Sequence, residues 1–346
     1  MLKIINLNIL LYIIYCIYNF YIVDIKIIKK NEIINGYTMG TNWKITIPKC
    51  NLHNQSIKNI KKVITNKLNK YEQKLSSWNN KSFVSIFNKY KARQPKLIDN
   101  DLEEIISMGI KIEKKTHGAL DIFIGSLINK WGFGPIKKAK KYLSEHKIKK
   151  ILNTTGIKYI QLVKNISGTY IQKSIPNLQI NLSTMGEGFA ADQLNKFLKQ
   201  KKIQNYTITI GGVVIGKTNQ KKNNIPVAIL APINNKNIVY SIINLKKGKA
   251  ISTSGTYRNY YKINKKNISH LINPITGKPI NNSLVSVSVI ANSALEADAW
   301  DTALMVLGLK EAKKIAILEK LSVYFIIKKN NHFYTWYSPQ FKQFLF

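Results

Sequence analysis

The stretch SALEADAWDTAL, residues 293–304, predicts the first turns of a helix around which the rest of the chain is arranged. Ser293 is a suitable N-cap, and Glu296 follows three positions later as its capping-box partner. Alanine and leucine, which have high helix propensity, fill many of the positions behind them. We therefore expect a helix that begins at about Ser293.

Asp298, Asp301 and Thr302 fall at positions i, i+3 and i+4 of this helix. That spacing puts two carboxylates and a hydroxyl on one face, near the positive end of the helix. Hard oxygen ligands of this kind suit Mg²⁺, which takes one or two carboxylates and leaves other positions to water and substrate phosphate. The alternative is that the carboxylates only complement the helix dipole. The stretch alone does not decide between the two.

The 346 residues, enough for one large domain or two ordinary ones, carry a strong positive charge. Lys and Arg number 54 against 17 Asp and Glu, which gives a formal net charge of +37. Such a charge suits nucleic acid or an anionic membrane. The lysines are scattered among Asn and Ile through every segment, however, and the sequence contains no helix-turn-helix, zinc-finger or RNP-type motif. We predict no nucleic-acid function, although a basic surface still attracts an anionic diphosphate cofactor.

An apolar run, residues 4–23, follows Lys3 near the start of the chain. Its length of roughly 20 residues suits a signal peptide or a membrane-spanning anchor. Cys16 adds a third option, a lipid-attached cysteine, although the bulky residues Ile13–Tyr15 before it are unfavourable for lipoprotein cleavage. We expect export, with the mode of attachment left open.

The predicted organisation is an export signal or membrane anchor with a short tether, residues 1–30, followed by one folded unit, residues 31–346. Regular structure is expected from about Gly36. Tyr37–Ile47 is predicted as one strand entered through a glycine turn.

Three other segments have clear periodicity. Ile57–Leu75 has the apolar spacing of an amphipathic helix. Tyr206–Ile210 is predicted as a strand, and Val213–Gly216 as its continuation around a bend at two glycines. Leu284–Ile290 alternates Val and Ser, which indicates a strand buried on one face only.

Several polar turns are candidates for a site. NLQINLSTMGEGFAAD, residues 177–192, passes from a short strand through Thr184 and two glycines into a helix, where backbone amides can meet an anion. Asp121 lies in a segment of turn formers and either binds a ligand or caps a helix. His270 precedes a Pro-Gly-Pro loop and is either a general base or a structural residue. Trp78 is either a packing residue or a ring-stacking platform.

Seven ordered blocks of the sequence together resemble the FAD:protein FMN transferases, the ApbE family. They are TMGTNW, GALDIFIGSLINKWGFGP, NLSTMGEGFAAD, TIGG, ISTSGTYRNYY, SHLINPITGKPI and SALEADAWDTALMVLG. The similarity covers roughly residues 36–346 and is greatest to the lipoprotein members of enterobacteria. It implies a T-fold-like α+β fold, with mixed sheets and packed helices in a single catalytic unit. It also implies FAD as substrate, Mg²⁺ as cofactor, and transfer of FMN to a Thr or Ser hydroxyl of a target protein with release of AMP.

The resemblance further implies the site residues. The metal-binding positions correspond to Thr184, Asp298, Asp301 and Thr302. The FAD-binding positions correspond to Met39, Trp78, Ala119, Leu120, Asp121, Asn181, Glu187 and Ile272. His270 matches the histidine that takes the proton from the attacking hydroxyl.

Three positions depart from the family pattern. Asn181 stands where close relatives have Asp, so a charge near the cofactor is absent. Asn273 stands where the SH-x-x-DP block has Asp, which is expected to change how His270 is oriented. Trp78 replaces a Tyr, so stacking is kept and a hydroxyl is lost. Because no metal ligand is removed, we predict an active transferase with lowered affinity for FAD.

Two other functions are compatible with the same residues: hydrolysis of FAD to FMN and AMP, and FAD binding by a lipoprotein without catalysis. The resemblance implies acceptors among the subunits of Rnf or Na⁺-translocating NADH:quinone reductase complexes. It implies a location at the bacterial inner membrane, facing the periplasm. There the chain would be held by a lipid at Cys16 or by an uncleaved N-terminal anchor.

Overall fold

The computed structural model describes residues 31–48, 57–91, 93–135, 141–219, 224–233, 237–257, 259–264 and 266–346. The predicted N-terminal anchor and Cys16 lie outside these residues. Among the helices of the described part, none has both the length and the apolar character needed to cross a bilayer. Within the described residues, the first strand begins at Asn31, earlier than the expected Gly36, and it is paired from its first residue.

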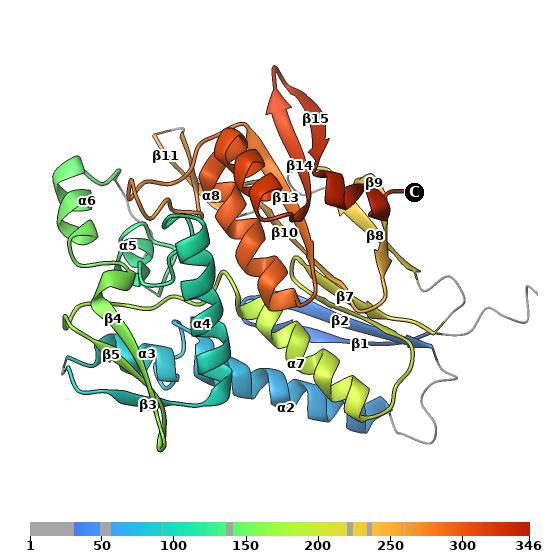
Figure 1. Cartoon of the computed structure of the whole chain (residues 1–346), viewed down its shortest axis with the longest axis horizontal. Helices are drawn as coiled ribbons and strands as arrows, with labels where there is room; N and C mark the ends of the chain where they lie inside the picture. Colours follow the sequence, from blue (N-terminus) through green and yellow to red (C-terminus); the bar gives the residue numbers. More distant parts are fainter. Residues whose placement is uncertain are drawn as a thin grey trace, which may run out of the picture.

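An antiparallel sheet of eight strands forms the centre of the molecule (Figure 1), in the order β1-β2-β6-β7-β10-β13-β14-β15. Its strands are β1 (Asn31–Thr38), β2 (Thr41–Pro48), β6 (Tyr206–Ile210), β7 (Val213–Lys217), β10 (Ala250–Gly255), β13 (Leu284–Ala291), β14 (Ser322–Lys329) and β15 (His332–Tyr337). Three smaller sheets lie around it. They contain β3 (Lys96–Ile98), β5 (Gly168–Lys173) and β4 (Ile160–Asn165), then β8 (Asn224–Leu230) with β9 (Val239–Lys246), and β11 (Tyr260–Ile263) with β12 (Lys266–Ser269).

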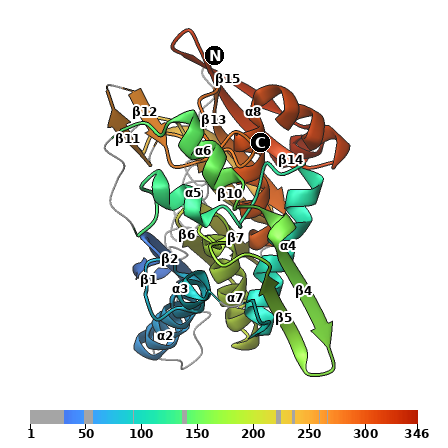
Figure 2. The same ribbon diagram turned by 90° about the vertical axis from the view of Figure 1, so that its left-hand side faces the viewer.

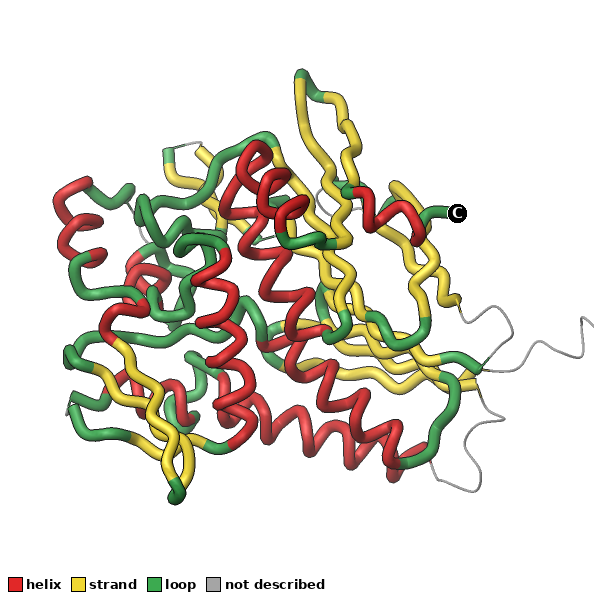
Figure 3. The backbone as a smooth tube through the Cα atoms, in the orientation of Figure 1, coloured by secondary structure: helices red, strands yellow, loops and turns green. Residues whose placement is uncertain are grey.

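Helices cover one face of the central sheet (Figure 3). The described helices are α2 (Ile57–Leu75), α3 (Phe83–Lys89), α4 (Asn100–Lys115), α5 (Gly125–Lys130), α6 (Glu145–Leu152), α7 (Gly186–Gln200) and α8 (Ala294–Leu318), with short 3-10 helices η2 (Ile157–Tyr159) and η3 (Pro339–Phe344). α7 lies against β6 and β7, and α8 lies against β10 and β13. α2 has the predicted bounds, and its buried side chains follow the predicted apolar stripe.

The other face of the sheet is covered as well. Val227 of β8 and Ile243 of β9 pack with Ile290 of β13 and with Phe341 of η3 in one apolar cluster. The expectation that β13 is buried on one face only is therefore wrong. Its serines Ser286 and Ser288 are as buried as its valines, because α8 packs on one side of the strand and the β8–β9 pair on the other.

Two pairs of strands in the central sheet, β1–β2 and β6–β7, are hairpins. Residues 37–47 do not form one strand, because Met39 (φ 49°) and Gly40 (φ 79°) adopt left-handed conformations and reverse the chain between β1 and β2. Gly211 (φ 52°) does the same between β6 and β7, so the bend predicted at the two glycines is the turn of a hairpin. β2 pairs with β6 in the register Trp43↔Ile210, so both turns lie at the same end of the sheet.

The predicted short strand before Thr184 is not part of a regular sheet. The side chain of Asn88 holds this segment instead: its Oδ1 accepts from the N–H of Ile180 at 2.7 Å, and its Nδ2 donates to the carbonyl of the same residue at 2.9 Å. An asparagine amide thus replaces the neighbouring strand. It positions the chain that leads to Thr184 and α7.

Candidate active site

A cavity of about 930 Å³ lies at the end of the central sheet that carries the β1–β2 and β6–β7 turns. Its walls also include the first turns of α7 and α8, and the loop that follows β12. Every residue predicted for the site lines this one cavity. They are Met39, Trp78, Ala119, Leu120, Asp121, Asn181, Thr184, Glu187, His270, Ile272, Asp298, Asp301 and Thr302.

Two acceptors fix the start of α8. Ser293 Oγ accepts from the backbone N–H of Glu296 at 3.1 Å, which confirms the predicted N-cap. The Glu296 carboxylate contacts Lys111 Nζ at 3.4 Å instead of completing a capping box. Asp192 of α7 accepts from the first two backbone N–H groups of α8 at 3.0 and 2.9 Å. Asp192 was not predicted, since no local pattern links residues so far apart in the sequence.

α7 and α8 approach each other closely at Gly188. A Cβ atom at this position would overlap the carbonyl oxygen of Ala294 and would lie 2.7 Å from Cβ of Asp298. Without a side chain, the N–H of Gly188 donates to Asp298 Oδ2 at 2.8 Å. Close helix packing therefore holds the Asp298 carboxylate in the cavity wall.

We expect Gly188→Ala to lower the free energy of unfolding by about 1–3 kcal/mol, because the new methyl group is forced against helix backbone. Gly186→Ala is the matched control in the same helical turn. The nearest neighbour of its new methyl group is Met39 Sδ at 3.6 Å, so the methyl fits and helix propensity improves. Urea denaturation compares the two variants, and equal stabilities would argue against the close contact at Gly188.

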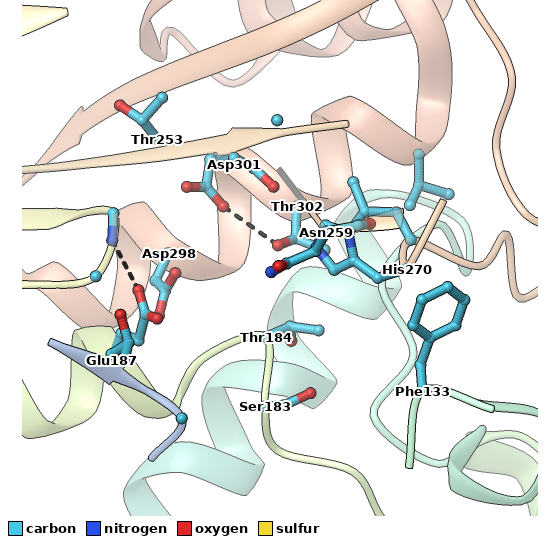
Figure 4. A pocket seen from close by; sticks show the side chains of 18 of the residues that line it. Phe133, Ser183, Thr184, Glu187, Thr253, Asn259, His270, Asp298, Asp301 and Thr302 are labelled. Carbon is cyan, nitrogen blue, oxygen red and sulfur yellow. Dashed lines mark hydrogen bonds between the residues drawn. The ribbon is translucent and has the colours of Figure 1, made fainter. Parts of the chain in front are cut away.

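Three carboxylates converge in the cavity (Figure 4). Glu187 accepts from a backbone N–H of the β6–β7 turn at 2.9 Å, and Asp298 accepts from Ser252 Oγ at 3.2 Å. Asp301 accepts from Thr302 Oγ1 at 3.3 Å. Among the ion pairs of the described residues, none includes these three carboxylates, so no cation in that part of the chain compensates their charge.

The three groups oppose one another's ionisation. Burial raises the pKa of Asp298 well above its usual range, and the charges of Asp301 and Glu187 raise that pKa further. Burial also raises the pKa of Asp301, against the effect of a hydrogen bond from Ser252. Burial raises the pKa of Glu187 too. A cation bound among these oxygens would favour the ionised forms.

The oxygen atoms around the carboxylates fit the predicted Mg²⁺. Thr184 Oγ1 is buried and has no hydrogen-bond partner among the described residues. With the Thr302 hydroxyl and the carboxylates of Asp298 and Asp301, it completes a set of hard oxygen donors. In the part of the chain that the structure describes, no group of three or more His, Cys, Asp and Glu side chains is arranged as a metal cluster. This donor set suits an ion that completes its coordination with water and phosphate.

His270 is held in one tautomer. Its Nδ1 lies 2.9 Å from the carbonyl oxygen of Asn259 (Figure 4). A carbonyl can only accept, so Nδ1 carries the proton and Nε2 carries a lone pair. Burial lowers the pKa of His270, against the raising effect of this hydrogen bond, and the imidazole is therefore neutral at pH 7. A neutral imidazole with a fixed tautomer in a cavity wall has the properties of a general base.

The two asparagines that depart from the family pattern hold local turns. Asn181 Oδ1 accepts from the N–H and the hydroxyl of Ser183 at 3.0 and 2.5 Å. Asn273 Oδ1 accepts from two backbone N–H groups just after it, at 2.8 and 3.0 Å. Both are acceptor roles that Asp would also fill. Because His270 is held by the carbonyl of Asn259, the expectation that Asn273 changes its orientation finds no contact to support it.

The remaining predicted residues differ in their exposure. Ala119, Leu120 and Ile272 are buried in the cavity wall, whereas Trp78 is 62% exposed. A ring this exposed adds little to the core, which favours the stacking platform over the packing alternative. Met39 lies in the β1–β2 turn, which the sequence had placed inside a strand.

Asp121 lines the cavity, and its Oδ1 accepts from the N–H of Phe123 at 2.7 Å in the turn before α5. It does not cap α5, whose N-cap is Ile124 without a side-chain hydrogen bond, so the helix-cap alternative is wrong and the ligand-binding role stays a prediction. Burial raises the pKa of Asp121 to about 6, and the charge of Glu113 adds to this effect. The raised pKa means that the folded protein binds the proton more tightly than the unfolded chain does. The resulting stabilisation is complete below the unfolded pKa, near 3.8, and is lost as the pH rises through about 6.

We therefore expect the difference in unfolding free energy between the natural chain and Asp121→Asn to depend on pH. It should shift in favour of the natural chain by about 2–3 kcal/mol between pH 7 and pH 4, because two pKa units correspond to that amount. Chemical denaturation at several pH values measures the shift. A difference that stays constant with pH would show that the pKa of Asp121 is not raised.

Comparisons with known proteins identify the family. A profile of the ApbE family matches residues 39–325. The chain belongs to the ApbE family. A relative named FAD:protein FMN transferase from Buchnera aphidicola subsp. Schizaphis graminum is 49% identical over 337 residues, which cover 96% of this chain and 98% of the relative. A relative of the same name from Escherichia coli K12 is 39% identical over 315 residues, with 90% and 89% coverage.

Solved structures confirm the predicted α+β fold of this ApbE-family chain. The flavin transferase ApbE from Vibrio cholerae superposes with a TM-score of 0.80 at 30% sequence identity, over 91% of this chain and 100% of the other. The apo flavinyl transferase ApbE from Pseudomonas stutzeri also gives a TM-score of 0.80, at 26% identity over 91% of this chain and 96% of that one. The overall sequence similarity is thus matched by a common architecture.

Proposed function

We propose that this ApbE-family protein is a Mg²⁺-dependent FAD:protein FMN transferase. The observation that carries the proposal is that two features share one cavity. A neutral His270 with a lone pair on Nε2 accompanies a cluster of carboxylates and hydroxyls that has no ion pair among the described residues. The first feature suits activation of an alcohol, and the second suits a cation beside a diphosphate. Relatives at up to 49% identity are named for this activity.

The chemistry follows from the residues of the cavity. His270 Nε2 accepts the proton of the acceptor's Thr or Ser hydroxyl, whose oxygen forms a bond to the phosphorus atom of the FMN half of FAD. The bond from this phosphorus to the bridging oxygen breaks, and AMP leaves with the electron pair. Thr184, Thr302, Asp298 and Asp301 would hold Mg²⁺, which when bound neutralises phosphate charge and stabilises the leaving group. Trp78 stacks on the flavin ring, and the buried wall around Leu120 excludes water.

The proposal extends to the acceptor and the location. We infer that the hydroxyl belongs to a subunit of an Rnf or Na⁺-translocating NADH:quinone reductase type complex. We also infer that the enzyme works at the periplasmic side of a bacterial inner membrane, attached through residues 1–30 or a lipid on Cys16. The apolar run of residues 4–23 and the family resemblance support this location.

Intact-mass analysis tests the function. The protein is incubated with FAD, Mg²⁺ and an acceptor domain that bears the target threonine, alongside controls with EDTA and with a Thr-to-Ala acceptor. A gain of one FMN that disappears in both controls supports the transferase. Release of AMP without that gain would indicate FAD hydrolysis, and bound FAD without AMP would indicate a flavin-binding protein without catalysis.

A further inference from the structure

Acidic residues are distributed far less evenly than the lysines. No Asp or Glu occurs between Asp192 and Glu296, although this stretch contains many lysines and half of the strands of the central sheet. Enrichment in lysine along the whole chain does not explain why Asp and Glu are absent from this one stretch. The stretch therefore gives part of the molecule a strong positive potential.

Lysines from separate elements meet at one end of the central sheet. The pKa of Lys217, at the end of β7, is lowered by burial and then by the charges of Lys199 and Lys247, which places these three cations close together. Lys67 of α2 and Lys201 both lie over the ring of Phe197, at 5.3 and 6.0 Å. We call Lys67, Lys199, Lys201, Lys202, Lys217 and Lys247 the basic end of the sheet.

Among the described residues, the basic end has no acidic counterpart. In the described part of the chain, its lysines form no ion pair, and Lys199, Lys201, Lys202 and Lys247 are exposed. Mutual repulsion among them is a cost that persists in the free protein. An anionic surface brought against this end would remove that cost.

The chain enters the folded unit at the same end. Asn31 pairs with Pro48, and β2 continues the ladder through Thr46↔Thr207 to Tyr206↔Lys217. Asn31, where residues 1–30 join, is thus on the edge that carries Lys217. Figure 1 shows α2, α7 and β7 reaching this side of the molecule.

The cavity lies at the opposite ends of the same strands. Gly40 and Gly212, which line it, occupy the turns of the two hairpins whose other ends carry Asn31 and Lys217. α5, α6, β11 and β12 also lie on the far side, which faces the viewer in Figure 2. A flat partner seated on the basic end would leave the cavity open to solution.

We propose that the basic end docks the folded unit on an anionic phospholipid bilayer and holds the cavity facing away from the lipid. The apolar run of residues 4–23 leads to this same end, so attachment and docking use one side of the molecule. Each lysine near such a surface strengthens binding roughly fivefold, and the effect falls off within a Debye length.

Hydrogen exchange of the full chain tests the docking. The protein is reconstituted into vesicles of phosphatidylcholine alone, or of phosphatidylcholine with about one-third phosphatidylglycerol, at about 0.1 M salt. We expect peptides covering residues 57–70 and 199–219 to exchange several-fold more slowly on the anionic vesicles only. Peptides from the β11–β12 pair should be unchanged. Equal exchange on both vesicles would overturn the proposal, even where residues 1–30 keep the protein attached.

Matched variants distinguish docking through the basic end from an effect of the overall net charge of the protein. Lys199→Glu, Lys201→Glu, Lys202→Glu and Lys247→Glu together should lower docking by more than about 100-fold and abolish the protection. The control reverses Lys149, Lys150, Lys310 and Lys329, which are exposed elsewhere, and should keep the protection. Changing the same four basic-end lysines to Gln should lower docking less than changing them to Glu. This comparison holds when both variants have the melting temperature of the natural chain. Loss of protection in the control, or equal protection by short duplex DNA without vesicles, would overturn the proposal.

Discussion

Asp298→Asn is expected to reduce flavin transfer by at least about 10³-fold, because removing one of two carboxylates weakens the hold on a cation that contributes several kcal/mol to phosphoryl chemistry. The fold should be as stable as that of the natural chain, or more so, since a buried and mutually repelling charge is removed. Asn keeps one oxygen, which can still accept from the N–H of Gly188, and its NH2 group can donate to the hydroxyl of Ser252. Transfer is measured by mass gain of the acceptor, and Mg²⁺ binding by calorimetry.

Asp99→Asn is the matched control for this change. Asp99 is an exposed N-cap carboxylate at the start of α4, where its loss should not alter transfer or Mg²⁺ binding. If Asp298→Asn binds Mg²⁺ and transfers FMN as well as the Asp99→Asn variant does, Asp298 only complements the helix, as the sequence alternative allowed.

His270→Ala is expected to lower the rate of transfer by about 10²–10⁴-fold at saturating FAD, which is the usual contribution of a general base. The dissociation constant for FAD should change little, because the variant removes a proton acceptor and leaves the flavin-stacking Trp78 in place. His146→Ala, an exposed histidine on α6, is the matched control and should be fully active. Loss of FAD binding together with transfer would instead identify His270 as a structural residue.

The pH profile provides an independent readout of His270. Its pKa lies below the usual 6.5, so the natural enzyme should keep full activity at pH 7 and lose it only as falling pH protonates the imidazole. The residual activity of His270→Ala should lack this acidic limb. An identical acidic limb in both proteins would assign the loss of activity to another group, such as one of the buried carboxylates whose pKa is raised.

The sequence predicted correctly those elements that are determined by residues close together along the chain. The apolar stripe fixed both ends of α2, and Ser293 fixed the start of α8. Ordered motifs predicted residues that all line one cavity, although their roles are still predictions. The turn at Met39 and Gly40 was missed because its alternating polarity resembles a strand, and only the pairing of β1 with β2 reveals the reversal.

Contacts between distant segments escaped prediction. Asp192 caps α8 across the α7–α8 contact, Ser252 donates to Asp298 from the neighbouring β10, and the Asn259 carbonyl fixes the tautomer of His270. A backbone carbonyl has no sequence signature. β13 was expected to face solvent on one side, but packing on both faces depends on where α8 and the β8–β9 pair lie, which its own residues do not specify.

The strands that run from the basic end to the cavity determine how far the cavity lies from a docked membrane surface. β2 has eight residues, which at roughly 3.3 Å each span about 26 Å. An enzyme docked through the basic end therefore works at a fixed elevation above the lipid headgroups. An acceptor threonine flush with the bilayer would be out of reach, whereas one on a segment that stands off by a comparable distance would be presented directly, so substrates would be selected by vertical position as well as by sequence.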